Sequence, residues 1–97
     1  MNPFFDEQGK RWVSAAERRG ARIEAPSLDS RVALELLELA RAAAHTQERR
    51  FAPLSCYLAG VAAERLRMAQ PGMDDARIAA YIEEVRREVE GEAPSEQ

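Results

Sequence analysis

Glycine and proline residues divide this sequence into segments of helix length, and this division constrains the fold more than any other feature. The breaks fall at Gly20, Pro26, Pro53, Pro71, Gly72 and Gly91. Between them alanine, leucine, glutamate and arginine predominate, so local propensity favours helix. No stretch alternates apolar and polar residues as a strand does. The sequence therefore predicts an all-α fold, an irregular four-helix bundle with helices at about 5–19, 30–44, 53–68 and 74–90.

The length and the cysteine content limit what kind of protein this is. A chain of 97 residues is expected to form one domain, here residues 1–91, followed by a flexible polar tail at 92–97. The single cysteine, Cys56, cannot form an intramolecular disulfide and fits a reducing compartment. The sequence has no signal peptide and no apolar run near the about 20 residues of a membrane span. We expect a cytoplasmic protein without membrane contact.

The apolar periodicity ranks the helices by their expected burial. Helix 30–44 has the broadest apolar face, which suits a central helix with two neighbours. On helix 74–90 the apolar residues form a narrow stripe, so we expect this helix at the periphery. The third helix is expected to complete the core, with an inner side formed by Leu54, Tyr57, Leu58, Val61, Ala62 and Leu66.

Leu34 is the one apolar residue that does not fit this pattern. On the helical wheel it projects between two charged residues, Glu38 and Arg41. It is therefore either covered by segment 21–28 or exposed for a partner, and it is our candidate interface residue.

No arrangement of residues in the sequence indicates catalysis or metal binding. His45 is the only histidine, and without a second histidine or a cysteine pair it predicts neither metal ligands nor a cofactor. Cys56 at the start of a helix can form a reactive thiolate paired with His45, although a free cysteine more often packs as a small apolar residue. The carboxylates Glu35 and Glu38 face outward on the wheel, which gives no acid/base pair. We assign no catalytic residue and favour a non-enzymatic role.

The connector before Pro53 offers a different chemistry, anion binding. Arg49 and Arg50 lie beside the N-terminus of a helix, where backbone N–H groups favour a phosphate, and His45 precedes them. The ordinary alternative is a solvated loop with local ion pairs. Nucleic acid is not an expected ligand, because the formal net charge of −3 opposes a broad basic surface.

Residues 35–63, ELLELARAAAHTQERRFAPLSCYLAGVAA, resemble a family of short, chiefly actinobacterial helical domains of unknown function. The shared elements are the leucine-rich helix ending at Ala44-His45, then Glu48-Arg49, Ala52-Pro53-Leu54 and Tyr57-Leu58-Ala59-Gly60. Members occur alone or beside molybdenum-cofactor proteins such as enzymes of molybdopterin-guanine dinucleotide synthesis, so the resemblance implies an accessory role. It also implies a structural or ligand-binding role for His45, Arg49 and Pro53.

These observations favour a non-catalytic protein-interaction or accessory module. Its partner is expected to be another protein, including a molybdenum-cofactor enzyme, or a second copy of the chain. The alternative is a small anion-binding or nucleotide-binding domain that uses the connector from His45 to Pro53, with Arg49 and Arg50 as ligands.

Overall fold

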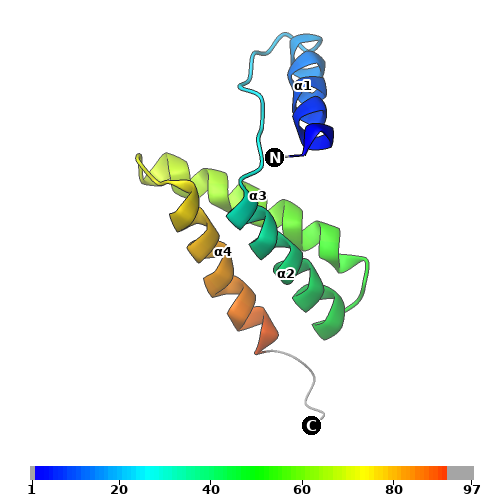
Figure 1. Ribbon diagram of the computed structural model, residues 1–97, viewed down its shortest axis with the longest axis vertical. Coiled ribbons are helices and arrows are strands. Elements are labelled where there is room, and N and C mark those ends of the chain that lie inside the picture. Colours follow the sequence, from blue (N-terminus) through cyan, green and yellow to red (C-terminus); the bar gives the residue numbers. More distant parts are fainter. Residues whose placement is uncertain (1, 92–97) are drawn as a thin grey trace. The chain divides into compact units, whose positions relative to one another are not determined.

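The structure, a computed structural model, describes residues 2–91, so the flexible tail predicted at 92–97 lies outside the described residues. Within this range the chain forms only helices, and no residue belongs to a strand. The all-α fold and the four helices predicted from the sequence are confirmed (Figure 1). In chain order they are α1 (Pro3–Glu17), α2 (Ser30–Thr46), α3 (Phe51–Ala69) and α4 (Asp75–Glu90).

The ends of α1 follow from local capping. The Asn2 side chain accepts a hydrogen bond of 2.8 Å from the Phe4 backbone N–H, and Pro3 occupies the first helical position, where its missing N–H costs nothing. At the other end Gly20 has a φ of 82°, a left-handed conformation that glycine adopts readily. These caps explain why the helix begins two residues before the predicted start.

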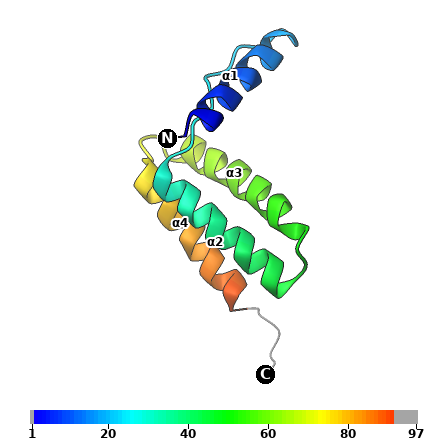
Figure 2. The ribbon, with the colours of Figure 1, turned by 45° about the vertical axis from the view of Figure 1, so that its right-hand side comes forward.

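The chain divides between Ser30 and Arg31 into two compact units, each described by itself. In the first unit, the segment after α1 turns and runs back beside the helix (Figure 2). Gly9 is the buried residue of α1, and a Cβ built there would lie 2.6 Å from the carbonyl oxygen of Pro26. A glycine in mid-helix is therefore explained by the close approach of this segment. The single domain predicted over residues 1–91 stays a prediction.

The second unit, formed by α2, α3 and α4, has a core to which α4 contributes as many buried residues as α2. Ile78 is 1% exposed and Ile82 4%, and they pack with Leu39 of α2 and Ala63 of α3. The prediction that α4 is peripheral is wrong. Its stripe is narrow, but the facing side of α3 carries small residues, so Ile78 and Ile82 of α4 reach into the core.

The predicted inner side of α3 is also wrong in part. Leu54, Tyr57 and Leu58 are exposed, whereas Ala59 and Ala63 face the core. α3 carries apolar residues around most of its circumference, so periodicity alone did not identify the buried side. The small side chains are the ones that allow neighbouring helices to approach.

One ion pair joins α2 to α4 within this unit. Arg86 donates to Glu35 from Nη2 at 3.0 Å and from Nε at 3.2 Å, and the two side chains are only 14% and 16% exposed. The expectation that Glu35 faces outward is therefore wrong. The wheel of α2 alone does not show that α4 covers this side of the helix.

Candidate functional site

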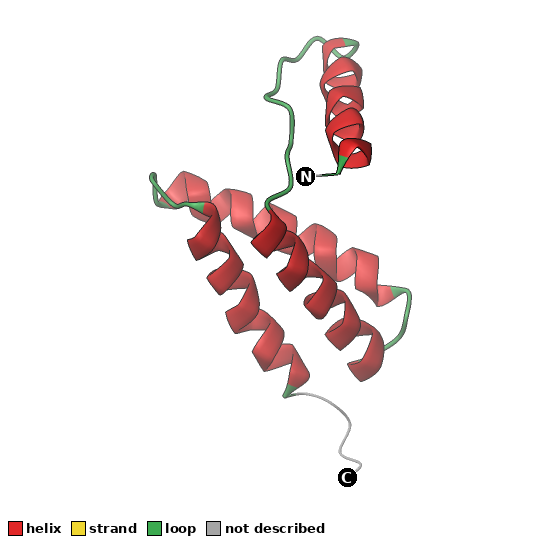
Figure 3. Cartoon of the chain, in the orientation of Figure 1, coloured by secondary structure: helices red, strands yellow, loops and turns green. Residues whose placement is uncertain are grey.

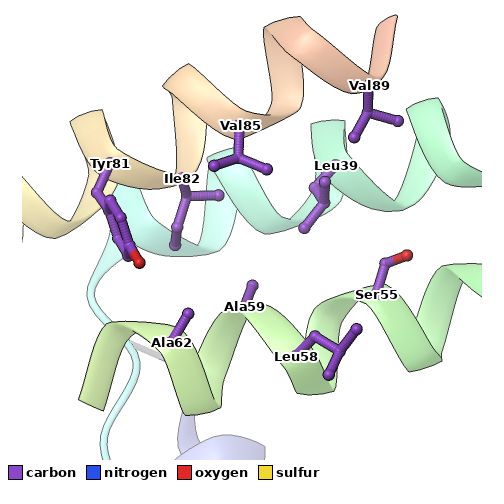
Figure 4. Close-up of a pocket in the computed structure, with 9 residues that line it drawn as sticks. All are labelled: Leu39, Ser55, Leu58, Ala59, Ala62, Tyr81, Ile82, Val85 and Val89. Carbon is purple, nitrogen blue, oxygen red and sulfur yellow. The ribbon is translucent and has the colours of Figure 1, made fainter. Parts of the chain in front are cut away.

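An apolar groove lies between α3 and α4, with α2 behind it (Figure 4). Its volume is about 260 Å³. Among the described residues no charged side chain lines it, and its polar side-chain groups are two hydroxyls. The lining residues are Leu39, Ser55, Leu58, Ala59, Ala62, Tyr81, Ile82, Val85 and Val89.

The groove has a buried floor and exposed lips. Leu39 and Ile82 form the floor and belong to the core cluster. Leu58 on α3 is 66% exposed, and Val85 on α4 is 45% exposed. Large apolar side chains at both lips are accessible to a partner, so the groove is continuous with an apolar surface.

The groove results from the residue sizes on the two helices. Figure 3 shows α3 and α4 joined by a short turn, in which Gly72 has a φ of 92°. On α3, Ala59 and Ala62 point toward α4 and leave space in front of Ile82 and Val85 (Figure 4). Larger residues at the two alanine positions would fill it.

The dimensions of the groove match a short helical segment. Along α3 it extends from Ser55 to Ala62, and along α4 from Tyr81 to Val89. At 1.5 Å per residue these stretches are about 10 Å and about 12 Å long, which is two turns of helix. Two turns present apolar residues at positions i, i+4 and i+7, the spacing by which helices bind in apolar grooves.

The three candidate anion ligands lie on or beside the connector between α2 and α3. His45 is in the last turn of α2 and is exposed. Arg50 pairs with Glu48 at 2.7 Å, so the carboxylate partly neutralises it. The Arg49 side chain is exposed and makes no ion pair with a described residue. The structure thus places these residues along one connector, and their binding role stays a prediction.

The suggested thiolate pair of Cys56 and His45 does not form. The Cys56 Sγ lies 3.6 Å from the carbonyl oxygen of Leu36, to which the thiol donates. Leu36 is nine residues before His45 on α2, so these two residues are about 14 Å apart along the helix axis. Burial raises the pKa of Cys56, which favours the unreactive thiol. Cys56 has the surroundings of a packing residue.

Leu34, the candidate interface residue, is 57% exposed on α2. It is not a lining residue of the groove, and its interface role stays a prediction. Sequence reasoning missed the exposed lips Leu58 and Val85. The available signal was the excess of apolar residues on α3, which is more than one buried face can use.

The described residues contain no group of three or more histidine, cysteine, aspartate or glutamate side chains placed to hold a metal ion. No helix in the part of the chain described here is long and apolar enough to cross a membrane.

A comparison with known families matches residues 6–97 to a domain of unknown function, DUF6457. No significant match was found among curated proteins or among solved structures. The resemblance to a helical domain of unknown function is thereby confirmed, while its link to actinobacteria and to the molybdenum cofactor finds no support in this match.

Proposed function

We propose that this chain, a member of the DUF6457 family of domains of unknown function, is a non-catalytic protein-interaction domain that binds the apolar face of a partner helix. The observation that supports it is the groove between α3 and α4, with Leu58 and Val85 exposed at its lips. Burying such side chains against a partner removes apolar surface from water, the main favourable term in protein association.

The composition of the groove favours a protein ligand over a small polar one. Its polar side-chain groups are the hydroxyls of Ser55 and Tyr81, which can orient a partner but cannot neutralise a charged ligand. The groove is open along two helical turns, which suits a row of apolar side chains from one face of a partner helix. A molybdenum-cofactor enzyme is the partner that the resemblance implies, and this finer assignment rests on the resemblance alone.

A nuclear magnetic resonance titration tests the proposal. The probe is a designed helical peptide with leucines at positions i, i+4 and i+7 and with lysines elsewhere. We expect concentration-dependent amide shifts at Leu58, Ala62, Tyr81 and Val85, because these residues line the groove. Shifts confined to the outer side of α2 around Leu34, or no shifts at all, would contradict the proposal.

Anion binding at the connector is a second candidate function. It is favoured by the unpaired Arg49 and by the start of α3, where Arg50 makes no capping hydrogen bond through its side chain. The first N–H groups of that helix have no side-chain cap, and those of Phe51 and Ala52 donate to the backbone carbonyl oxygens of Glu48 and Arg49. Titration with inorganic phosphate at constant ionic strength should shift the amides of residues 49–52 if this function exists. Unchanged amides would remove it.

A further inference from the structure

The charged residues of α4 fall into two groups. Most have a partner within the chain: Asp75 pairs with Arg67, Glu83 with Arg87, and Arg86 with Glu35 and Glu90. Asp74 accepts a hydrogen bond from the Arg77 backbone N–H as the helix cap. The remaining side chains, those of Arg77, Glu84 and Glu88, are exposed and make no ion pair with any described residue.

The three unpaired side chains lie together on the groove side of α4. At 100° per residue, each projects within about 60° of Tyr81, which lines the groove. The spacing of Arg77, Tyr81, Glu84 and Glu88 is four, three and four residues, which keeps them on one seam along the helix. Arg86 and Glu90 project to the opposite side of the core stripe.

The positions of these charges are unfavourable in an isolated helix. Arg77 is in the first turn, at the positive end of the helix dipole, and Glu88 is in the last turn, at the negative end. Glu84 and Glu88 are also like charges one turn apart, which repel each other. A second helix running antiparallel along the seam would relieve all of these effects.

We propose that a second copy of the chain binds the seam formed by Arg77, Tyr81, Glu84 and Glu88. The two α4 helices then lie antiparallel along this seam. The inference goes beyond the proposed function, because the second copy contributes the charged seam of α4 and not the apolar face of a helix. A two-fold axis places Arg77 against Glu88 of the second copy, and Tyr81 against Glu84 of the second copy. Each contact occurs twice, as an isologous interface requires. Val85, which is 45% exposed, projects about 40° from Tyr81 on α4 and supplies apolar area beside this seam.

Sedimentation velocity of the full chain, over a concentration series reaching about 1 mM, tests this arrangement. We expect a monomer–dimer equilibrium that weakens between about 0.05 M and about 1 M salt. Arg77→Glu should raise the dimer dissociation constant by about tenfold or more. The substitution places two negative charges against each other at both of the symmetry-related contacts with Glu88. The double variant Arg77→Glu/Glu88→Arg should restore dimerisation, because it exchanges the two charges.

The melting temperatures of these variants distinguish a loss of dimerisation from a loss of folding. Arg77→Glu and Glu88→Arg both agree with the helix dipole, so neither should lower the melting temperature of the dilute protein. Arg11→Glu makes the same change of charge at an exposed residue of α1 and should leave the dissociation constant unchanged.

Two outcomes would overturn the inference. One is a monomer at every concentration and salt level, and the other is a dimer that Arg77→Glu does not weaken. If the protein is monomeric but the helical peptide still shifts the groove amides, the interaction function stands and only the second copy is excluded. If neither self-association nor peptide binding occurs, both proposals fail.

Discussion

Arg86 on α4 holds Glu35 on α2 through two nitrogens, Nη2 and Nε, at 3.0 and 3.2 Å from Oε1. The same guanidinium reaches Glu90 one turn later, at 3.2 Å. The hydrogen bond to Glu35 raises the pKa of Arg86, so the guanidinium stays charged throughout the physiological pH range. Since both side chains are mostly covered, this pair fixes the side of α4 that faces α2 and thereby orients the groove on the other side.

Glu35→Ala should therefore destabilise the three-helix unit. We expect the melting temperature to fall by on the order of 5 °C, because the charged Arg86 loses its partner on α2. The matched control is Glu38→Ala on the same helix, whose pairing with Arg41 at 3.7 Å is exposed to solvent. Surface pairs of this kind contribute little, so the control should melt close to the wild type. Equal melting temperatures for the two variants would contradict the assigned role of the Arg86 pair.

Ile78→Ala should be strongly destabilising, because Ile78 is the most deeply buried large side chain of the described residues. Removing its buried methyl and methylene groups should cost about 2–4 kcal/mol in the free energy of unfolding. Val85→Ala, on the same helix at the lip of the groove, should cost less than about 1 kcal/mol. Chemical denaturation of both variants measures the difference. Similar values would mean that α4 is peripheral after all.

Gly9 and Gly60 provide a matched pair of glycine-to-alanine substitutions. A Cβ at Gly60 meets no atom within 4 Å, so Gly60→Ala should stabilise the protein by about 0.5–1 kcal/mol. A Cβ at Gly9 would lie 2.6 Å from the Pro26 carbonyl oxygen, so Gly9→Ala must displace the returning segment. We expect the amide shifts of Ser27 and Leu28 to move toward random-coil values. If they do not change, the segment does not pack on α1 in solution.

Cys56 should react slowly with iodoacetamide in the folded protein. Burial raises its pKa, so at neutral pH the folded state holds less thiolate than the unfolded state, and the rate should increase as the pH rises. The raised pKa also makes stability depend on pH. Because the pKa of Cys56 is higher in the folded than in the unfolded state, it stabilises the protein below the unfolded pKa, and this contribution is lost as the pH rises through the folded pKa. A folded protein that reacts faster than the urea-unfolded chain would restore the reactive-thiolate hypothesis.

Local sequence signals were enough to place the helices. The breaks at Gly20 and at Pro71-Gly72 depend on short-range chemistry, and both glycines adopt the left-handed conformation in the structure. The groove could not be predicted from single helices, because it depends on which residues of different helices face each other. Whether Leu58 is buried depends on the size of the residues opposite it, and the burial of Glu35 depends on Arg86, 51 residues later.

Gly9 and Gly60 illustrate the same limit. Both are glycines inside helices, where a glycine suggests the close approach of another backbone. Such an approach occurs at Gly9, because the returning segment passes there, while Gly60 faces open space. A helical wheel does not distinguish a glycine that another backbone approaches closely from a glycine without such a neighbour.

The most direct test of the groove as a protein-binding surface is the affinity of the leucine-bearing helical peptide for two variants. Leu58→Asp puts a charge at the lip of the groove, and Leu34→Asp makes the same change at a similarly exposed leucine outside it. We predict that Leu58→Asp weakens binding by about tenfold or more, since a buried charge replaces an apolar contact, and that Leu34→Asp binds like the wild type. Unchanged binding by Leu58→Asp together with weakened binding by Leu34→Asp would contradict the proposal and assign the interface to the outer face of α2.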